Sequence, residues 1–178
     1  MNGKYMAYVG SYSYTGKAKG ITVYDVDVEN GVFKERCEME VDNSSYVIAS
    51  SDGKTLYSIA DEGVVSFRIL QNGSLARLNS SPIRGMRGCH LCTDMEDKYV
   101  FVSGYHDGKT TVLSLNKDGS VGEIVDEVYH KGYGSVAERN FRSHITCTRR
   151  MPDGRYVLSV DNGTDQVKVY RFNEKDKN

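Results

Sequence analysis

Residues 52–83 read DGKTLYSIADEGVVSFRILQNGSLARLNSSPI, and this stretch decides the fold. A turn at Asp52-Gly53 leads into a β-rich run, and a second run of alternating character begins at Gly63. The dipeptide Asn72-Gly73 then marks a tight hairpin turn, because both residues readily take the φ > 0 conformations that such turns require. Another β-rich run follows this turn. The stretch therefore predicts three consecutive antiparallel strands joined by short turns.

The same pattern recurs along the whole chain. The first run has the counterparts GKYMAYVGSY from Gly3, EDKYVFVSGY from Glu96 and DGRYVLSVDN from Asp153. The second run has the counterparts GITVYDVDV from Gly20, KTTVLSLN from Lys109 and QVKVYRFN from Gln166. The turn glycines Gly31, Gly73 and Gly119 are spaced by 42 and 46 residues. A four-stranded propeller blade has a period of about 40 to 45 residues, so the repeat predicts a β-propeller.

A further short strand precedes three of the four copies, in SYVIASS from Ser45, CHLCTDM from Cys89 and SHITCTRRM from Ser143. We predict that these are the innermost strands, which gives blades of 3, 4, 4 and 3 strands. No window carries a helical period, so the class is all-β. The predicted fold is an incomplete ring of four-stranded antiparallel blades, with about 3.5 blades in this chain. The blade units are approximately 1–42, 43–86, 87–130 and 143–178, with an insertion at 129–142.

Composition excludes several classes of protein. The formal net charge is -1 and no basic tract is present, so a nucleic-acid partner is not expected. No apolar run approaches the roughly 20 residues that span a bilayer, and no leader pattern precedes the repeats, so we expect a cytoplasmic protein without a membrane partner. The four cysteines are interpreted as small core residues, and neither a metal site nor a cofactor is expected.

Three side chains occupy matching places on the innermost strands. Tyr46, His90 and Thr146 lie 7, 7 and 8 residues before the following turn positions, so they are expected to converge near one mouth of the central channel. The insertion is expected over the same mouth. Between residues 129 and 155 basic residues outnumber acidic ones, which suggests a small anionic ligand. The basic residues there are Lys131, Arg139, Arg142, Arg149, Arg150 and Arg155, and the acidic ones are Glu138 and Asp153.

In order along the chain, several motifs resemble those of the seven-bladed propeller lactonases, a family that includes bacterial 6-phosphogluconolactonase and the fungal 3-carboxymuconate lactonizing enzymes. They are YVGSY, NSSYVIASSDGKTLYSIAD, RGCHLCTDMEDKYVFVSGYHDGK, AERN and SHITCTRRMPDGRYVLSVDNGTDQVKVYRF. The resemblance implies a seven-bladed ring in a relative about twice as long. It also implies a lactone hydrolase acting on an anionic sugar lactone such as 6-phosphogluconolactone.

The resemblance assigns catalytic roles to His90, Glu138 and Arg139, and likens His144 to the first histidine of a His-x-His pattern. The second histidine of that pattern falls on Thr146, and the glutamine that commonly follows the arginine falls on Asn140. Lactone hydrolysis needs a base, for which His90 or Glu138 is suited, and a cationic group such as Arg139 for the anion. His144, Tyr46, Thr146 and Arg142 are the expected substrate-binding residues.

Two alternative functions remain open at this stage. A 3-carboxy-cis,cis-muconate cycloisomerase would use the same arginines for carboxylates. A non-catalytic propeller that serves as a binding module would leave His90 as a channel-lining residue and Glu138-Arg139 as an exposed loop pair. His106 and His130 are assigned to surface loops.

The chain as given is expected to be a partial propeller without an independent active site. Its first copy lacks an innermost strand and its last copy lacks an outermost one. Such blades leave apolar faces uncovered. We therefore expect a homo-oligomer, or association with a complementary propeller half.

Overall fold

The computed structural model describes residues 5–136 and 141–173, which form fourteen strands and no helix. The strands make four antiparallel sheets in chain order. The first sheet contains β1 (Tyr5–Gly10), β2 (Gly20–Asp27) and β3 (Val32–Glu40). The second contains β4 (Val47–Ala49), β5 (Thr55–Ile59), β6 (Gly63–Ile69) and β7 (Leu75–Pro82).

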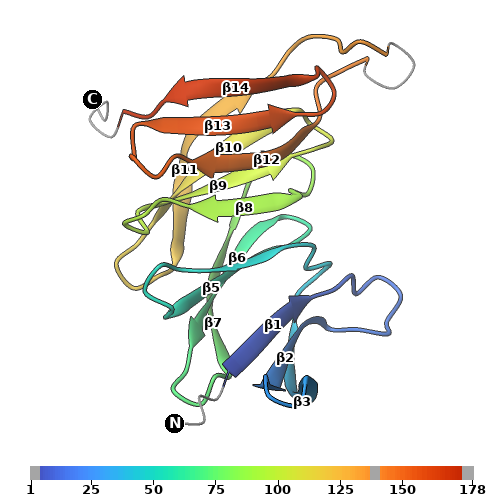
Figure 1. Cartoon of the computed structure of the whole chain (residues 1–178), viewed down its shortest axis with the longest axis vertical. Helices are drawn as coiled ribbons and strands as arrows, with labels where there is room; N and C mark the ends of the chain where they lie inside the picture. The colour runs from blue at the N-terminus through green and yellow to red at the C-terminus, as the bar shows by residue number, and fades with distance from the viewer. Residues whose placement is uncertain (1–4, 137–140, 174–178) are drawn as a thin grey trace.

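The third sheet contains β8 (His90–Thr93), β9 (Tyr99–Gly104), β10 (Lys109–Leu115) and β11 (Val121–Tyr129). The fourth contains β12 (Ile145–Arg150), β13 (Tyr156–Asp161) and β14 (Gln166–Arg171). The sheets follow one another along the long axis of the molecule, with β1 to β3 at one end and β12 to β14 at the other (Figure 1). The all-β propeller class and the strand numbers predicted from the repeats are confirmed, and in the described residues the ring is open.

Turn glycines fix how neighbouring sheets meet. Gly73 and Gly119 have φ values of 82° and 87°, a region that is strained for residues with a Cβ atom. Each turn also lies against the preceding sheet, where a Cβ on Gly73 would meet Met6 and one on Gly119 would meet Thr55. The Tyr8 hydroxyl donates a hydrogen bond of 2.9 Å to the Gly73 carbonyl. The hairpin turns read from the sequence therefore also act as contacts between blades.

Apolar clusters lie between successive sheets. Ile21 and Val23 of the first sheet pack with Leu56 and Phe67 of the second. On the other side of the second sheet, a larger cluster joins it to the third, and its buried members are Tyr57, Ile59, Val64, Ile83, Leu91, Val100, Val102, Leu113 and Val121. Alternation along each strand thus gives one set of side chains to each neighbouring blade.

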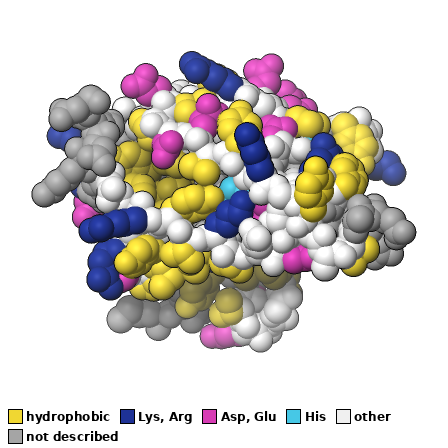
Figure 2. Space-filling view, turned by 90° about the horizontal axis from the view of Figure 1, so that it is seen from above, with side chains coloured by type: hydrophobic (Ala, Val, Ile, Leu, Met, Phe, Trp, Pro, Cys, Tyr) yellow, Lys and Arg dark blue, Asp and Glu magenta, His cyan; other side chains and the backbone are white. Residues whose placement is uncertain are grey.

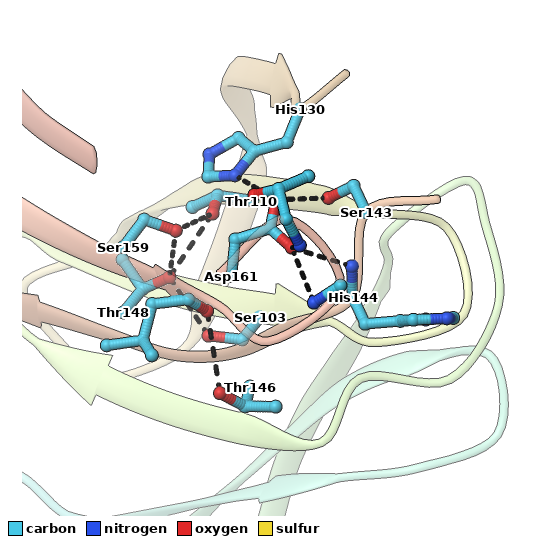
Figure 3. A network of polar contacts seen from close by, with 12 residues as sticks. Ser103, Thr110, His130, Ser143, His144, Thr146, Thr148, Ser159 and Asp161 are labelled. Atoms are coloured by element: carbon cyan, nitrogen blue, oxygen red, sulfur yellow. Dashed lines mark hydrogen bonds and ion pairs between the residues drawn. The ribbon is translucent and has the colours of Figure 1, made fainter. Parts of the chain in front are cut away.

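The interface between the third and fourth sheets is partly polar. Phe101, Val112 and Val157 form a small buried apolar cluster there. Beside it lies a group of four buried hydroxyls, here named the hydroxyl cluster and made of Ser103, Thr110, Thr148 and Ser159. The Ser103 to Thr148 oxygen distance is 2.9 Å, and the other three contacts measure 3.2 to 3.4 Å (Figure 3). This interface depends on directional hydrogen bonds as well as on packing.

The outer face of the fourth sheet is uncovered. Val167 and Val169 of β14 are 59% and 61% exposed, and Val160 of β13 is 37% exposed. Seen from above this sheet, apolar side chains are interspersed with both basic and acidic ones (Figure 2). Within the described residues, no helix is long and apolar enough to cross a membrane.

Candidate active site

The mouth is the side of the molecule at which β8 and β12 begin, on the right in Figure 1. His90 is the first residue of β8, and Tyr46 directly precedes β4 on the neighbouring blade. Their ring centroids are 4.7 Å apart, at an interplanar angle of 47°. The structure therefore brings together two of the three residues that the sequence placed at matching positions.

His90 is an almost buried, neutral imidazole. It is 8% exposed, and burial together with the nearby charge of Arg149 lowers its pKa. Its Nε2 atom lies 3.6 Å from the Cys147 sulfur. Its Nδ1 atom is buried and has no hydrogen-bond partner in the described parts of the chain. His90 thus has an unused polar atom, but that atom is not open to a substrate in the mouth.

His144 is held in a defined tautomer. Its Nδ1 lies 2.9 Å from the carbonyl oxygen of Tyr105, and because a carbonyl only accepts hydrogen bonds, Nδ1 must bear the proton. The ring also stacks on Tyr105, with centroids 4.3 Å apart and planes at 17°. Nε2 makes no hydrogen bond within residues 5–136 and 141–173, and the residue is 7% exposed. An imidazole oriented in this way is suited to act as a general base.

A buried carboxylate fixes the backbone that carries His144. Asp161, at the end of β13, accepts hydrogen bonds from the Ser143 hydroxyl at 2.6 Å and the His144 amide at 2.8 Å (Figure 3). The amides of Gly163 and Thr164 donate to the same carboxylate at 3.1 and 3.2 Å. Burial alone would raise the pKa of Asp161, but these hydrogen bonds outweigh it and hold the pKa well below its usual range. The carboxylate is therefore ionised and ties the start of β12 to the β13–β14 turn.

His130 joins the same network, and its assignment to a surface loop was wrong. It is 6% exposed, with Nδ1 at 2.9 Å from an oxygen of Asp161 and Nε2 at 2.8 Å from the Tyr170 hydroxyl. Burial lowers its pKa against the opposing effect of Asp161, so the ring is neutral and donates from Nδ1. The expectation failed because its partners are 31 and 40 residues away in sequence.

The remaining predicted residues are less closely associated with this site. The Thr146 hydroxyl donates to the Val160 carbonyl of its own sheet at 3.4 Å. Arg142 is exposed, with its guanidinium 5.5 Å from the Phe141 ring centroid. Glu138 and Arg139 lie outside the described residues.

The basic residues that the sequence groups together between 129 and 155 lie at both ends of the blade. β12 runs away from the mouth, so Arg150 lies at its far end, where the guanidinium sits 3.8 Å from the Phe172 ring centroid and Nε donates to the Gly154 carbonyl at 3.1 Å. Arg155 follows in the next turn and bonds Asp153 at 2.9 Å. Counting charges along the sequence overlooked the direction of the strand.

Sequence reasoning also missed a small pocket on the mouth side. It has a volume of about 170 Å³ and is lined by residues that include Tyr12, Arg87, Tyr105 and His106. Arg87 lies 4.8 Å from the Tyr12 ring centroid and bonds Asp61 at 2.8 Å. The position of Arg87, directly before Gly88 and Cys89 in the motif that contains His90, was the available signal. In the described residues, no group of three or more His, Cys, Asp or Glu side chains is placed to hold a metal ion.

Comparison with known proteins identifies the family of the chain. The family model described as "Lactonase, 7-bladed beta-propeller" matches residues 6–178. The chain belongs to this lactonase family. The 6-phosphogluconolactonase of Bacillus subtilis is 32% identical over 177 residues, which cover 96% of this chain and 50% of that protein. The chain thus spans about half the length of the curated relatives it matches.

Solved structures of the lactonase family agree with the fold. A candidate 6-phosphogluconolactonase from Bacteroides fragilis superimposes with a TM-score of 0.89 at 32% identity, covering 97% of this chain and 49% of the other. A periplasmic gluconolactonase from Pseudomonas aeruginosa gives a TM-score of 0.86 at 26% identity, covering 94% and 49%. The four sheets therefore correspond to about half of a seven-bladed lactonase propeller.

Proposed function

We propose that this chain forms part of a lactonase that hydrolyses an anionic sugar lactone such as 6-phosphogluconolactone. The observation that supports it most directly is His144, an imidazole with its proton fixed on Nδ1 by the Tyr105 carbonyl and with a free Nε2 lone pair at the mouth. The family match and the relatives named as 6-phosphogluconolactonases supply the substrate class.

In the proposed reaction, Nε2 of His144 takes a proton from water as the water attacks the lactone carbonyl. The tetrahedral intermediate carries an oxyanion, which requires cationic or N–H donors, and we assign this role to Arg139. Arg142 is proposed to hold the anionic group of the substrate. His90 and Tyr46 are proposed to contact the sugar ring from the channel wall, with Thr146 beside them, and Glu138 to assist proton transfer.

The test is a comparison of variants in the complete propeller with 6-phosphogluconolactone as substrate. We expect His144→Gln to lower kcat/KM by about 10²-fold or more, the usual contribution of a general base. Thr93→Ala is a matched control, because Thr93 ends β8 at the side away from the mouth. If His144→Gln and Thr93→Ala both retained parental kcat/KM, the proposed base would be wrong.

The substrate is tested by parallel assays with unphosphorylated gluconolactone and with 3-carboxymuconate. We expect the phosphorylated lactone to give the highest kcat/KM. A higher kcat/KM for gluconolactone than for the phosphorylated lactone would contradict the role assigned to the anionic group of the substrate. Turnover of carboxymuconate alone would identify the cycloisomerase instead.

We also propose a cytoplasmic location and an association through the outer sheets. All four cysteines are free, as is usual in a reducing compartment. The exposed valines of β13 and β14 are suited to bind a second copy of the chain or a complementary propeller half. Cell fractionation tests the first proposal, since recovery in a periplasmic or secreted fraction would contradict it.

A further inference from the structure

Cys147 occupies an irregular place on an inner strand. The register of β12 against β13 shifts between Ile145 and Cys147, which is the signature of a β-bulge. Bulges re-aim side chains and are frequent beside functional sites. Cys147 is half-buried, so part of the residue is in contact with solvent.

The thiol is paired with a base. Its sulfur lies 3.6 Å from Nε2 of His90, within hydrogen-bond range for sulfur. His90 is more than nine-tenths buried, and its Nδ1 atom has no hydrogen-bond partner in the part of the chain that the structure describes. Burial and the charge of Arg149 lower the pKa of His90, so the ring is neutral and, with its proton on Nδ1, has a lone pair on Nε2. A neutral imidazole at this distance can take the thiol proton as the sulfur attacks.

The other cysteines have different surroundings. The Cys89 thiol donates to the Ile145 carbonyl at 3.4 Å, and the Cys92 thiol to the Thr93 carbonyl at 3.2 Å. Burial raises the pKa of both. Cys37 is half-buried like Cys147, but no imidazole of the described chain is within hydrogen-bond distance of it. Cys37 is therefore the internal control, because it is a half-buried thiol with no imidazole beside it.

We propose that Cys147 is a site of covalent modification by small disulfides, with His90 as the base. The Cys147 thiol gives its proton to Nε2 of His90 and its sulfur attacks one sulfur of the disulfide. A new S–S bond forms, the original S–S bond breaks, and the leaving thiolate takes the proton from His90. Cys147 is oxidised to a mixed disulfide while half of the small disulfide is reduced to a thiol.

The experiment measures the modification of each cysteine by peptide mass spectrometry, using oxidised glutathione at pH 7 as the probe. We expect Cys147 in the parental chain to react about ten-fold faster than Cys37, and His90→Gln to reduce the Cys147 rate to that of Cys37. Equal rates for Cys147 and Cys37 in the parental chain would overturn the proposal. An unchanged Cys147 rate in His90→Gln, with the buried Cys92 still protected, would also overturn it.

Cys92 reports on folding, because it is buried and its reaction in His90→Gln would reveal local opening. In that case His90→Asn repeats the test with a smaller side chain at the same position. We expect this variant also to lower the Cys147 rate to that of Cys37. A parental Cys147 rate in His90→Asn would contradict the role of His90 as the base. None of these outcomes depends on lactone turnover, so they test the thiol separately from the proposed function.

Discussion

Replacing Asp161 by alanine removes an acceptor that five donors share. The donors are the Ser143 hydroxyl, Nδ1 of His130 and the amides of His144, Gly163 and Thr164. Asp161 is 1% exposed, so most of these groups would lose their partner away from bulk water. Each unsatisfied buried donor costs about 1 to 3 kcal/mol, but the vacated space admits water and the turn amides relax toward solvent. We expect a net loss of about 3 to 5 kcal/mol, the range for breaking a buried charged network.

The assay is urea and thermal denaturation, with hydrogen exchange of the His144, Gly163 and Thr164 amides. For a chain of this size, the expected loss corresponds to a decrease in Tm of roughly 6 to 20 °C. Asn162→Ala is the control in the same turn, because the Asn162 side chain is exposed and makes no hydrogen bond within the described residues, and we expect a much smaller change. A loss below about 1 kcal/mol for Asp161→Ala, with unchanged amide protection, would show that the network does not hold the start of β12.

Three further predictions follow from the described contacts. Burial lowers the pKa of His130 from its ordinary 6.5, so the unfolded chain binds a proton at a higher pH than the folded chain and the free energy of unfolding decreases as the pH falls below 6.5. The urea midpoints at pH 7 and pH 5 should therefore differ less in His130→Gln than in the parental chain. An equal difference in both chains would contradict the lowered pKa of His130. Gly119→Ala should destabilise the fold by about 1 to 3 kcal/mol and Gly31→Ala by less, because of these two glycines only Gly119 has a neighbour, Thr55, that an added Cβ would meet. Equal losses of stability in denaturation would disprove the contact with Thr55. Val167→Lys combined with Val169→Lys should shift sedimentation of the chain toward the monomer, whereas an unchanged distribution would exclude this face from association.

Much of the fold could be read from the sequence because each strand is followed by its own turn chemistry. Asn72-Gly73 and Asp118-Gly119 fix hairpins locally, and the repeat of these hairpins gives the number of strands in each sheet. Counting back from the next turn placed Tyr46 and His90 in register, and the structure puts their rings in contact. Local pattern was sufficient here because both residues start equivalent strands.

The remaining features depend on pairs that are distant in sequence. Cys147 and His90 are separated by 57 residues, and their contact requires a bulge that leaves no mark in the strand pattern. The tautomer of His144 is set by a backbone carbonyl, that of Tyr105, which no side-chain motif can reveal. Both contacts join the third sheet to the fourth, so they depend on how the two sheets pack and not on local sequence.

The hydroxyl cluster places four mutually bonded, buried side-chain hydroxyls at the interface between the third and fourth sheets. Separating apolar faces exposes apolar surface to water, whereas hydroxyls that separate from one another can form hydrogen bonds with water instead. Hydrogen bonds are also directional, so a sheet that slides by one residue loses them, while an apolar contact tolerates small shifts. The fourth sheet is therefore expected to hold a single register against the third, because a slide of one residue would separate the three hydroxyl contacts that cross between the sheets. The hydroxyl cluster thus selects the position of the last blade, while the apolar residues beside it supply the packing.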